Sequence, residues 1–208
     1  MSEVKSKVLA LSFDDGPNTG VMVKMLELLR HFDAKATFFV VGSNLSDSSV
    51  PVLKQAIEQG HEIGNHSHSH SHMSAMEKAQ MLKEVNSLQE RLERLTGVKP
   101  ALFRPPYLDV NDAMLETIPM PFIGGSGNND WDPDCTVDER VELALRSAGD
   151  GAILLMHCFD GNDAAVEAVG RILPELRRRG YRMVTVSRLF AEKGIEPQNG
   201  VLYQNVYI

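Results

Sequence analysis

The chain has 208 residues, of which 43% are hydrophobic and 24% charged, a balance typical of one folded domain rather than of a disordered chain. The formal net charge is −7, so neither a nucleic acid nor an anionic membrane, which both attract basic surfaces, is expected as a partner. No apolar run reaches the roughly 18 residues of a membrane-spanning helix, and the two cysteines, Cys135 and Cys158, favour free thiols over a disulfide framework.

Apolar runs alternate with segments of helical spacing in the first half of the chain. The first run, KVLALSF, predicts a buried strand that ends in an acidic, Gly-Pro turn. We expect strands at 7–13, 36–41 and 61–64 and helices at 21–32, 51–60 and 74–96. In the longest helix, Ser74 is the predicted N-cap, with Glu77 three residues later as in a capping box.

The second half of the chain continues this alternation. We expect strands at 121–123, 151–156 and 181–186 and helices at 137–147, 164–179 and 187–193. Repeated strand–helix units predict an α/β fold with a largely parallel sheet, and about seven units in a single domain of residues 1–208 favour a (β/α) barrel over an open sheet. Polar clusters follow several predicted strands, and since such barrels carry their chemistry at the C-terminal ends of the strands, we expect one site there.

Two adjacent carboxylates, Asp14 and Asp15, follow the first strand and precede Gly16 and Pro17. Such a pair is costly to bury unless a cation or hydrogen-bond donors compensate. Because neighbouring side chains diverge at the end of a strand, one carboxylate can bind a metal ion while the other faces a substrate. The alternative is a pair that only forms a turn or caps a helix.

A histidine-rich tract, HSHSHSH, occupies residues 66–72. Imidazoles four residues apart can hold one metal ion, and both His66 with His70 and His68 with His72 have this spacing. The alternative is a solvated loop that binds metal only adventitiously. Two histidines and one aspartate leave positions open on a metal ion, where water becomes more acidic and a carbonyl is polarised, so the chemistry predicted is hydrolysis.

Arg104 precedes two prolines and Tyr107. Its guanidinium can pair with a buried carboxylate or bind substrate, and the alternative is a surface ion pair. Pro105 and Pro106 make the loop rigid, which would suit the positioning of a backbone N–H near Tyr107.

His157 ends the predicted strand GAILLM and is a candidate proton donor for a leaving group, although a lone histidine there is more often structural. For Trp131 and Leu155, core packing is the better interpretation of each residue alone. Together they would form the wall of a small, methyl-sized pocket.

Five segments in this order resemble the polysaccharide deacetylase family, which is carbohydrate esterase family 4 and is also called the NodB homology domain. The segments span most of the chain, and the first two are highly specific. They are SFDDGP (12–17), GHEIGNHSHSH (60–70), FRPPY (103–107), NDWD (129–132) and LLMH (154–157).

The resemblance implies a distorted (β/α) barrel with about seven parallel strands. It also implies one divalent metal ion, most often zinc and in some members cobalt or nickel. The implied ligands are Asp15, His66 and His70, because His66 follows the GHEIGN run as the family ligand does.

The family also implies catalytic roles for other residues. Asp14 would be the general base for the attacking water, Arg104 would orient Asp14, and His157 would protonate the leaving group. The Tyr107 backbone N–H would stabilise the oxyanion. The implied substrate-binding residues are Tyr107, Pro105, Trp131 and Leu155, the last two against the acetyl group.

Two positions depart from the family pattern. The first aspartate of the family's Asp-x-x-Asp-Trp motif falls on Gly127, so either Asp130 or Asp132 replaces it, or His157 has no carboxylate partner. The position after RPPY, often glycine, is Leu108, which we expect to narrow the groove.

These features predict a metal-dependent hydrolase that removes acetyl groups from a carbohydrate, with O-acetylated xylan or N-acetylglucosamine polymers as the partner. An ester is slightly favoured over an amide, because an untuned His157 would matter less for an ester leaving group. The alternatives are a non-catalytic carbohydrate-binding protein on the same fold and a metal-handling protein that uses its histidine tract. Residues 1–17 show no signal peptide, which leaves open a cytoplasmic protein or a secreted one whose leader lies outside this sequence.

Overall fold

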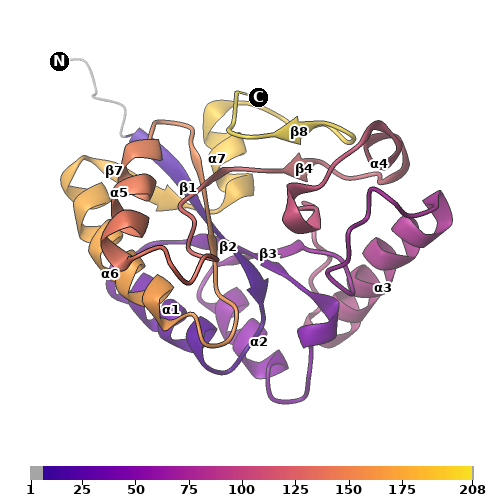
Figure 1. Cartoon of the computed structure of the whole chain (residues 1–208), viewed down its shortest axis with the longest axis horizontal. Helices are drawn as coiled ribbons and strands as arrows, with labels where there is room; N and C mark the ends of the chain where they lie inside the picture. Colours follow the sequence, from indigo (N-terminus) through magenta and orange to yellow (C-terminus); the bar gives the residue numbers. More distant parts are fainter. Residues whose placement is uncertain (1–6, 208) are drawn as a thin grey trace.

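The structure, a computed structural model, describes residues 7–207. A curved sheet of parallel strands lies at its centre, with helices around it (Figure 1). The strands are β1 (Lys7–Gly16), β2 (Ala36–Val40), β3 (Glu62–Asn65), β4 (Phe122–Ile123), β5 (Ser126–Gly127), β6 (Ile153–His157), β7 (Tyr181–Val184) and β8 (Leu202–Tyr203). The α-helices are α1 (Val21–His31), α2 (Val50–Glu58), α3 (Lys78–Thr96), α4 (Asp112–Thr117), α5 (Val137–Ser147), α6 (Asp163–Arg178) and α7 (Val186–Lys193), and short 3-10 helices lie at Gly42–Asn44 and Pro106–Leu108.

Strand β1 is the central strand of the main sheet. The order is β3-β2-β1-β6-β5, and β7 pairs with the first half of β1, all in parallel. Residues 8–13 of β1 are all buried, because the strand has neighbours on both edges and side chains packed on both faces. This central position places Asp14 and Asp15 at the C-terminal edge of the sheet.

The sheet closes only partly into a barrel. Beyond β3, the single residue Phe103 forms parallel bridges with Asn65 of β3 and Phe122 of β4, and β4 pairs with β8. The chain then crosses through Gly124 and Gly125 to β5, which pairs with β6 on the other side. The predicted α/β fold with a distorted barrel of parallel strands is therefore confirmed, with irregular pairing where β4 and β5 replace a long strand.

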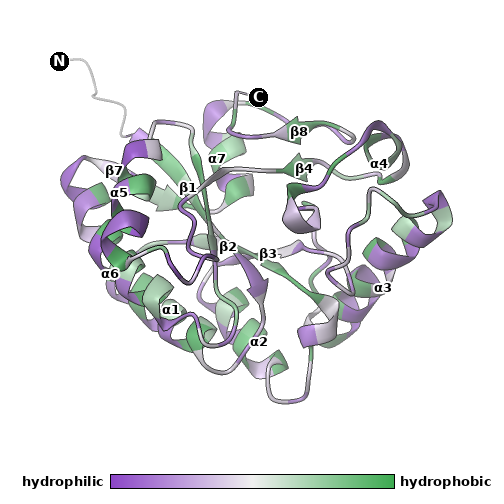
Figure 2. Ribbon diagram, viewed as in Figure 1, coloured by the Kyte–Doolittle hydropathy of each residue, from purple (hydrophilic) through white to green (hydrophobic). Residues whose placement is uncertain are grey.

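Helices form a continuous outer layer: α5 packs on α6, α6 on α1, α1 on α2, and α2 on α3. Each presents an apolar face to the sheet, and Figure 2 shows the green strands and inner helix faces against purple outer faces. None of the helices within residues 7–207 has the length and apolar composition needed to cross a lipid bilayer. Cys135 and Cys158 are both free thiols, as expected.

The predicted start of the longest helix was wrong. Helix α3 begins at Lys78, with Glu77 as its N-cap residue, and not after Ser74. The Ser74 hydroxyl donates instead to Asp109 Oδ2 (2.5 Å), and its carbonyl accepts from Asn111 Nδ2 (2.8 Å). Ser74 is thus held by a distant turn, which competes with the local capping that its sequence pattern predicts.

Candidate active site

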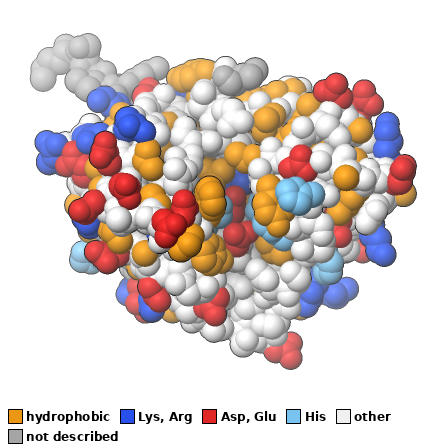
Figure 3. All heavy atoms as spheres, viewed as in Figure 1, with side chains coloured by type: hydrophobic (Ala, Val, Ile, Leu, Met, Phe, Trp, Pro, Cys, Tyr) orange, Lys and Arg blue, Asp and Glu red, His pale blue; other side chains and the backbone are white. Residues whose placement is uncertain are grey.

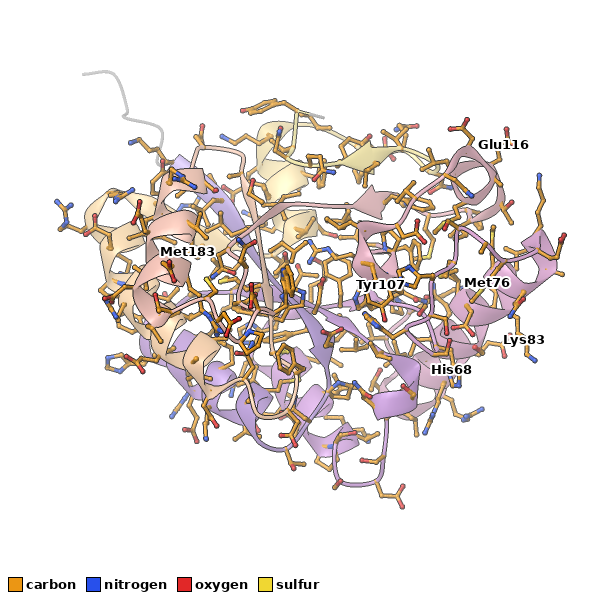
Figure 4. The ribbon with its side chains drawn as sticks, viewed as in Figure 1. His68, Met76, Lys83, Tyr107, Glu116 and Met183 are labelled. Carbon is orange, nitrogen blue, oxygen red and sulfur yellow. The ribbon has the colours of Figure 1, made fainter. Side chains whose placement is uncertain are left out.

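Strands β1, β3 and β6 end at the same edge of the sheet, and the residues that follow them surround one cavity of about 430 Å³. Figure 3 shows histidine and acidic side chains gathered between hydrophobic ones near the centre of this face, and Figure 4 labels Tyr107 there. The polar clusters that were predicted to form one site therefore do contribute residues to one cavity. The cavity is lined by Asp14, Asp15, His66, His70, Tyr107, Leu108, Gly127, Trp131, Leu155 and His157.

Asp15, His66 and His70 form a cluster whose candidate ligand atoms all lie within 4.8 Å of one another. Asp15 Oδ1 lies 3.2 Å from His70 Nε2 and 3.6 Å from His66 Nε2. This oxygen is buried, yet neither nitrogen is aligned to donate a hydrogen bond to it. A buried acceptor without a hydrogen bond, facing two imidazole nitrogens, fits a divalent metal site with open positions.

The backbone around this cluster is held in an uncommon conformation. Asp15 and His70 have positive φ angles of 70° and 57°, which cost free energy in residues other than glycine. Asn44 Nδ2 donates to the Asp15 carbonyl (2.8 Å), and the Ser67 hydroxyl accepts from the His70 N–H (3.0 Å). Neighbouring side chains therefore hold both candidate ligands in strained positions, as is common at functional sites.

The protonation states of the cluster also suit metal binding. The Arg104 carbonyl can only accept, so His66 Nδ1 carries the proton in their 2.7 Å hydrogen bond and Nε2 is free to bind. Burial lowers the pKa of His66, although Asp14 and Asp15 oppose the shift. Burial acts to raise the pKa of Asp15, but the nearby His70, 3.2 Å away, and the charge of His66 outweigh it, so that pKa is lowered. A neutral imidazole and an ionised carboxylate are the metal-binding forms.

The other pair of histidines lies apart from this cluster. His72 stacks on the Tyr107 ring, with centroids 4.0 Å apart and planes at 16°, and its Nδ1 lies 3.4 Å from Asp109 Oδ2. His68 packs so closely on Gly42 that a Cβ there would lie 2.5 Å from His68 Nδ1. Within residues 7–207, the candidate ligands come together in the preferred register of His66 and His70.

Asp14 forms an ion pair at the bottom of the cavity. Arg104 Nη1 donates to Asp14 Oδ1 (2.7 Å), while its other nitrogens donate to the Ser12 hydroxyl and to the carbonyls of Ile123 and Gly124. Arg104 is fully buried and Asp14 is 3% exposed, so the alternative of a surface ion pair is excluded. A buried charge pair is tolerated when its remaining donors are satisfied, and here the guanidinium also uses backbone acceptors.

His157 has a carboxylate partner after all. Asp130 Oδ1 lies 2.7 Å from His157 Nδ1, and Asp130 Oδ2 accepts from the His157 backbone N–H (2.8 Å). Burial acts to lower the pKa of His157, but the hydrogen bond that its ring donates to Asp130 and the charges of Asp14 and Asp130 raise it overall. Asp132 Oδ1 instead accepts from the Asp134 N–H (2.9 Å), so Asp130 is the replacement that the sequence left open.

Two further residues hold the segments that carry the His157–Asp130 pair, and sequence analysis did not identify either of them. Arg140 of α5 is 4% exposed and donates to the Asp132 carbonyl (2.9 Å) and to Asn162 Oδ1 (3.0 Å). Asn162 Nδ2 then donates to the Asp130 carbonyl (3.2 Å) and lies 3.4 Å from the His157 carbonyl. In sequence, Arg140 looks like an ordinary charge on an amphipathic helix, and only its burial reveals the network.

The apolar and aromatic side chains in the cavity walls differ in burial. Leu155 is 6% exposed, which agrees with core packing, whereas Trp131 and Tyr107 are 61% and 59% exposed at the cavity rim. Tyr107 and Leu108 have positive φ angles of 59° and 52°. This left-handed region of backbone conformation favours glycine over other residues. Leu108 adopts this conformation without being glycine, and its side chain lines the cavity as expected.

Pro105 is the predicted substrate-binding residue that lies away from the cavity lining. It is buried beneath the turn, and its carbonyl accepts from the Leu108 N–H (3.1 Å). Its fixed ring shapes the turn that presents Tyr107, and a contact of Pro105 with substrate stays a prediction.

A family model for polysaccharide deacetylases matches residues 2–119, which is more than half of the chain. The chain belongs to the polysaccharide deacetylase family. The expected resemblance is thus confirmed, and the matched range contains Asp14, Asp15, His66, His70 and Tyr107 of the cavity lining.

Relatives of this family member include proteins named for two kinds of glycan. The chain is 38% identical to a bifunctional xylanase/deacetylase from Pseudobutyrivibrio xylanivorans, over 92% of this chain and 32% of that protein. It is 34% identical to a peptidoglycan-N-acetylglucosamine deacetylase from Bacillus cereus, over 90% of both proteins. The chain thus spans about a third of the first relative and most of the second.

A solved structure extends the comparison to three dimensions. A family 4 acetyl xylan esterase from Clostridium thermocellum, in complex with a cobalt ion, superposes with a TM-score of 0.94 at 34% identity, covering 97% of this chain and all of that one. The fold of this family member is therefore that of a carbohydrate esterase whose structure contains a metal ion.

Proposed function

We propose that the chain is a metal-dependent hydrolase that removes acetyl groups from a carbohydrate. The observation that carries the proposal is one cavity that unites a candidate metal cluster, a buried Asp14–Arg104 pair and a His157–Asp130 pair. The names of the relatives support the acetylated-glycan class, since they include a xylanase/deacetylase and a peptidoglycan deacetylase.

Asp15, His66 and His70 would hold a divalent ion, with zinc proposed and cobalt as the alternative that the solved relative contains. When bound, such an ion would supply acidification of water and polarisation of the acetyl carbonyl. The open cavity beside the cluster leaves room for the acetyl group, and we propose one ion for each chain.

Asp14 would accept a proton from the attacking water. Its Oδ1 is occupied by Arg104, so the carboxylate is held in one orientation, and Oδ2 lies 3.8 Å from His66 Nε2 beside the cluster. A base held at the water position contributes through orientation as well as basicity. Arg104 would act through Asp14 and is a positioning residue in this scheme.

His157 would protonate the oxygen or nitrogen that leaves. The hydrogen bond to Asp130 holds its Nδ1 and leaves Nε2 to face the cavity, and the raised pKa keeps the ring protonated to higher pH. Leu155 and Trp131 would contact the acetyl group, and the Tyr107 backbone N–H would stabilise the oxyanion.

The reason for favouring an ester substrate no longer holds. It rested on an untuned His157, and the ion pair with Asp130 removes that premise. We therefore propose that the site can hydrolyse both O-acetyl and N-acetyl groups, because both reactions pass through a tetrahedral centre and both leaving groups can take the His157 proton.

The test is acetate release from acetylated xylan and from N-acetylglucosamine oligomers by the metal-loaded protein. Each substrate is assayed with and without a chelator, and a heat-denatured sample gives the background. We expect release that the chelator abolishes and added zinc or cobalt restores. No release with either ion from either substrate would overturn the proposal.

A further inference from the structure

A second cavity adjoins the catalytic one. It measures about 560 Å³ and shares Asp15 and His70 with the catalytic cavity, so the two form one continuous groove. Its walls come from the segments after β1, β2 and β6. The lining residues are Asp15, Pro17, Asn18, Thr19, Val41, Ser43, Asn44, Ser46, Ser48, Ser49, His70, Phe159 and Asp160.

Hydroxyl and amide side chains dominate this second cavity. Below the centre of Figure 3 the surface is largely white, which marks backbone and uncharged polar side chains. Several of these groups hold one another: Ser49 Oγ donates to the Asn44 carbonyl (2.9 Å), and Ser46 Oγ lies 3.1 Å from Ser49 Oγ. A pre-formed wall of this kind suits sugar hydroxyls, because its groups lose little further freedom on binding.

Away from the candidate metal cluster, the second cavity carries one exposed carboxylate, that of Asp160. Asp15 also lines it, but a bound metal ion would offset that charge. Neither cavity is lined by a lysine or an arginine among the described residues. Arg104 lies beneath the catalytic cavity and is paired with Asp14. An anionic group on a bound glycan would therefore meet the carboxylate of Asp160, whereas a neutral or cationic sugar would not be repelled.

An aromatic side chain of the second cavity lies near His157. Phe159 lines the second cavity, and its ring lies 6.4 Å from the ring of His157, the proposed proton donor. A sugar linked to the leaving group would extend past His157 along this wall. An aromatic face at that point can contact the apolar C–H face of a sugar ring.

We propose that this second cavity binds the sugar next to the acetylated unit, and that it accepts neutral or cationic sugars and rejects carboxylated ones. The inference rests on the proposed function and narrows its substrate class. Neutral xylan segments and N-acetylglucosamine oligomers fit this groove, whereas glycans with a free carboxylate on the neighbouring sugar, such as N-acetylmuramic acid in a strand without its peptide, do not.

The experiment uses the metal-loaded protein and three tetrasaccharides of equal length. The first is an N-acetylglucosamine oligomer, the second alternates N-acetylglucosamine with N-acetylmuramic acid, and the third has the muramic carboxylate converted to its amide. The amide keeps the size of the lactyl group and removes only its charge. We expect kcat/KM for the amide to exceed that for the carboxylate about threefold to tenfold, mainly through KM.

Variants identify the source of the discrimination. Asp160→Asn should reduce the amide-to-carboxylate ratio toward one, and Asp160→Lys should invert it. Asp163→Asn is the matched control, because Asp163 is an exposed partner of Lys24 that does not line the groove, and its ratio should match that of the unchanged protein. The ratio should also fall at high salt, since Asp160 is exposed and its field is screened.

Two results would overturn the inference: equal kcat/KM for the carboxylate and the amide, or no gain in kcat/KM from the N-acetylglucosamine monomer to the tetramer. Calorimetry of the same glycans with the metal-loaded Asp14→Asn variant measures binding without turnover. It therefore separates a failure of this inference from a failure of the proposed function. Preferential binding of neutral glycans without any acetate release from the unchanged protein would contradict the function and support the cavity.

Discussion

The side of the cavity with the proposed base, Asp14, and the side with the proposed acid, His157, hold their carboxylates in different ways; we call them the base side and the acid side. Asp14 lies on the central strand and is paired directly with a fully buried arginine, Arg104. Asp130 lies on a loop between β5 and α5, and the Arg140 guanidinium reaches that loop through backbone carbonyls and Asn162. A group on a strand is fixed by the sheet, whereas a group on a loop needs a network of its own.

The largest effect is expected from removing the proposed base, Asp14. We expect Asp14→Asn to lower kcat for acetate release by about 10²–10⁴-fold, because the attacking water loses its proton acceptor. The affinity for zinc should change little, since Asp14 is outside the candidate ligand cluster. Steady-state kinetics and a metal-binding titration check the two halves, and normal turnover by this variant would contradict the base assignment.

Removing Arg104 tests whether its ion pair holds Asp14 in place. We expect Arg104→Leu to lower the free energy of unfolding by about 3–5 kcal/mol, because the Asp14 carboxylate, 3% exposed, is left buried without its partner. Urea unfolding measures the loss. The double variant with Asp14→Asn should recover part of it, and a double variant as unstable as the single one would show that the ion pair is not the cause.

Changes on the acid side are expected to alter mainly the pH dependence of activity. His157 donates only while protonated, so activity falls as pH rises through its pKa, which Asp130 raises. We therefore expect Asp130→Asn to move the alkaline limb of kcat/KM to lower pH and to lower kcat for amide substrates by about 10–100-fold. Asp132→Asn is the control, and the same shift in that variant would contradict the pairing.

The smallest effect is expected from the network behind the acid. Arg140→Gln should loosen the Asp130 loop and lower turnover of N-acetylglucosamine oligomers severalfold, or about 1 kcal/mol for the lost hydrogen bonds. Hydrolysis of 4-nitrophenyl acetate, whose leaving group needs no proton, should change less. An equal loss on both substrates would mean that Arg140 only stabilises the fold.

The difference between the two sides also explains which residues of the site could be predicted from the sequence. The base side and the candidate metal ligands lie in contiguous motifs at strand ends, where chemistry and spacing coincide, so Asp14, Asp15, His66 and His70 were placed correctly beside one cavity. The strand–helix alternation likewise predicted the α/β fold, because buried parallel strands are long apolar runs.

The acid side depends on contacts between segments far apart in the chain. The pairing of Asp130 with His157 joins residues 27 positions apart, and Arg140 reaches Asn162 across 22 positions. No local pattern encodes these distances, and the same tertiary competition moved the start of α3 away from Ser74. Core packing, the better interpretation of Trp131 alone, does not hold at 61% exposure, whereas its interpretation with Leu155 as a pocket wall placed it at the cavity.

The most direct test of the proposed metal-dependent site is the metal content of single variants beside their acetate release. Native mass spectrometry of the zinc-loaded protein should show one ion for each chain, and His66→Ala and His70→Ala should lose both the ion and the activity. His68→Ala and His72→Ala, matched changes in the same tract, should retain the ion. Loss of the ion from His68→Ala or His72→Ala, with retention in His66→Ala, would contradict the site of Asp15, His66 and His70.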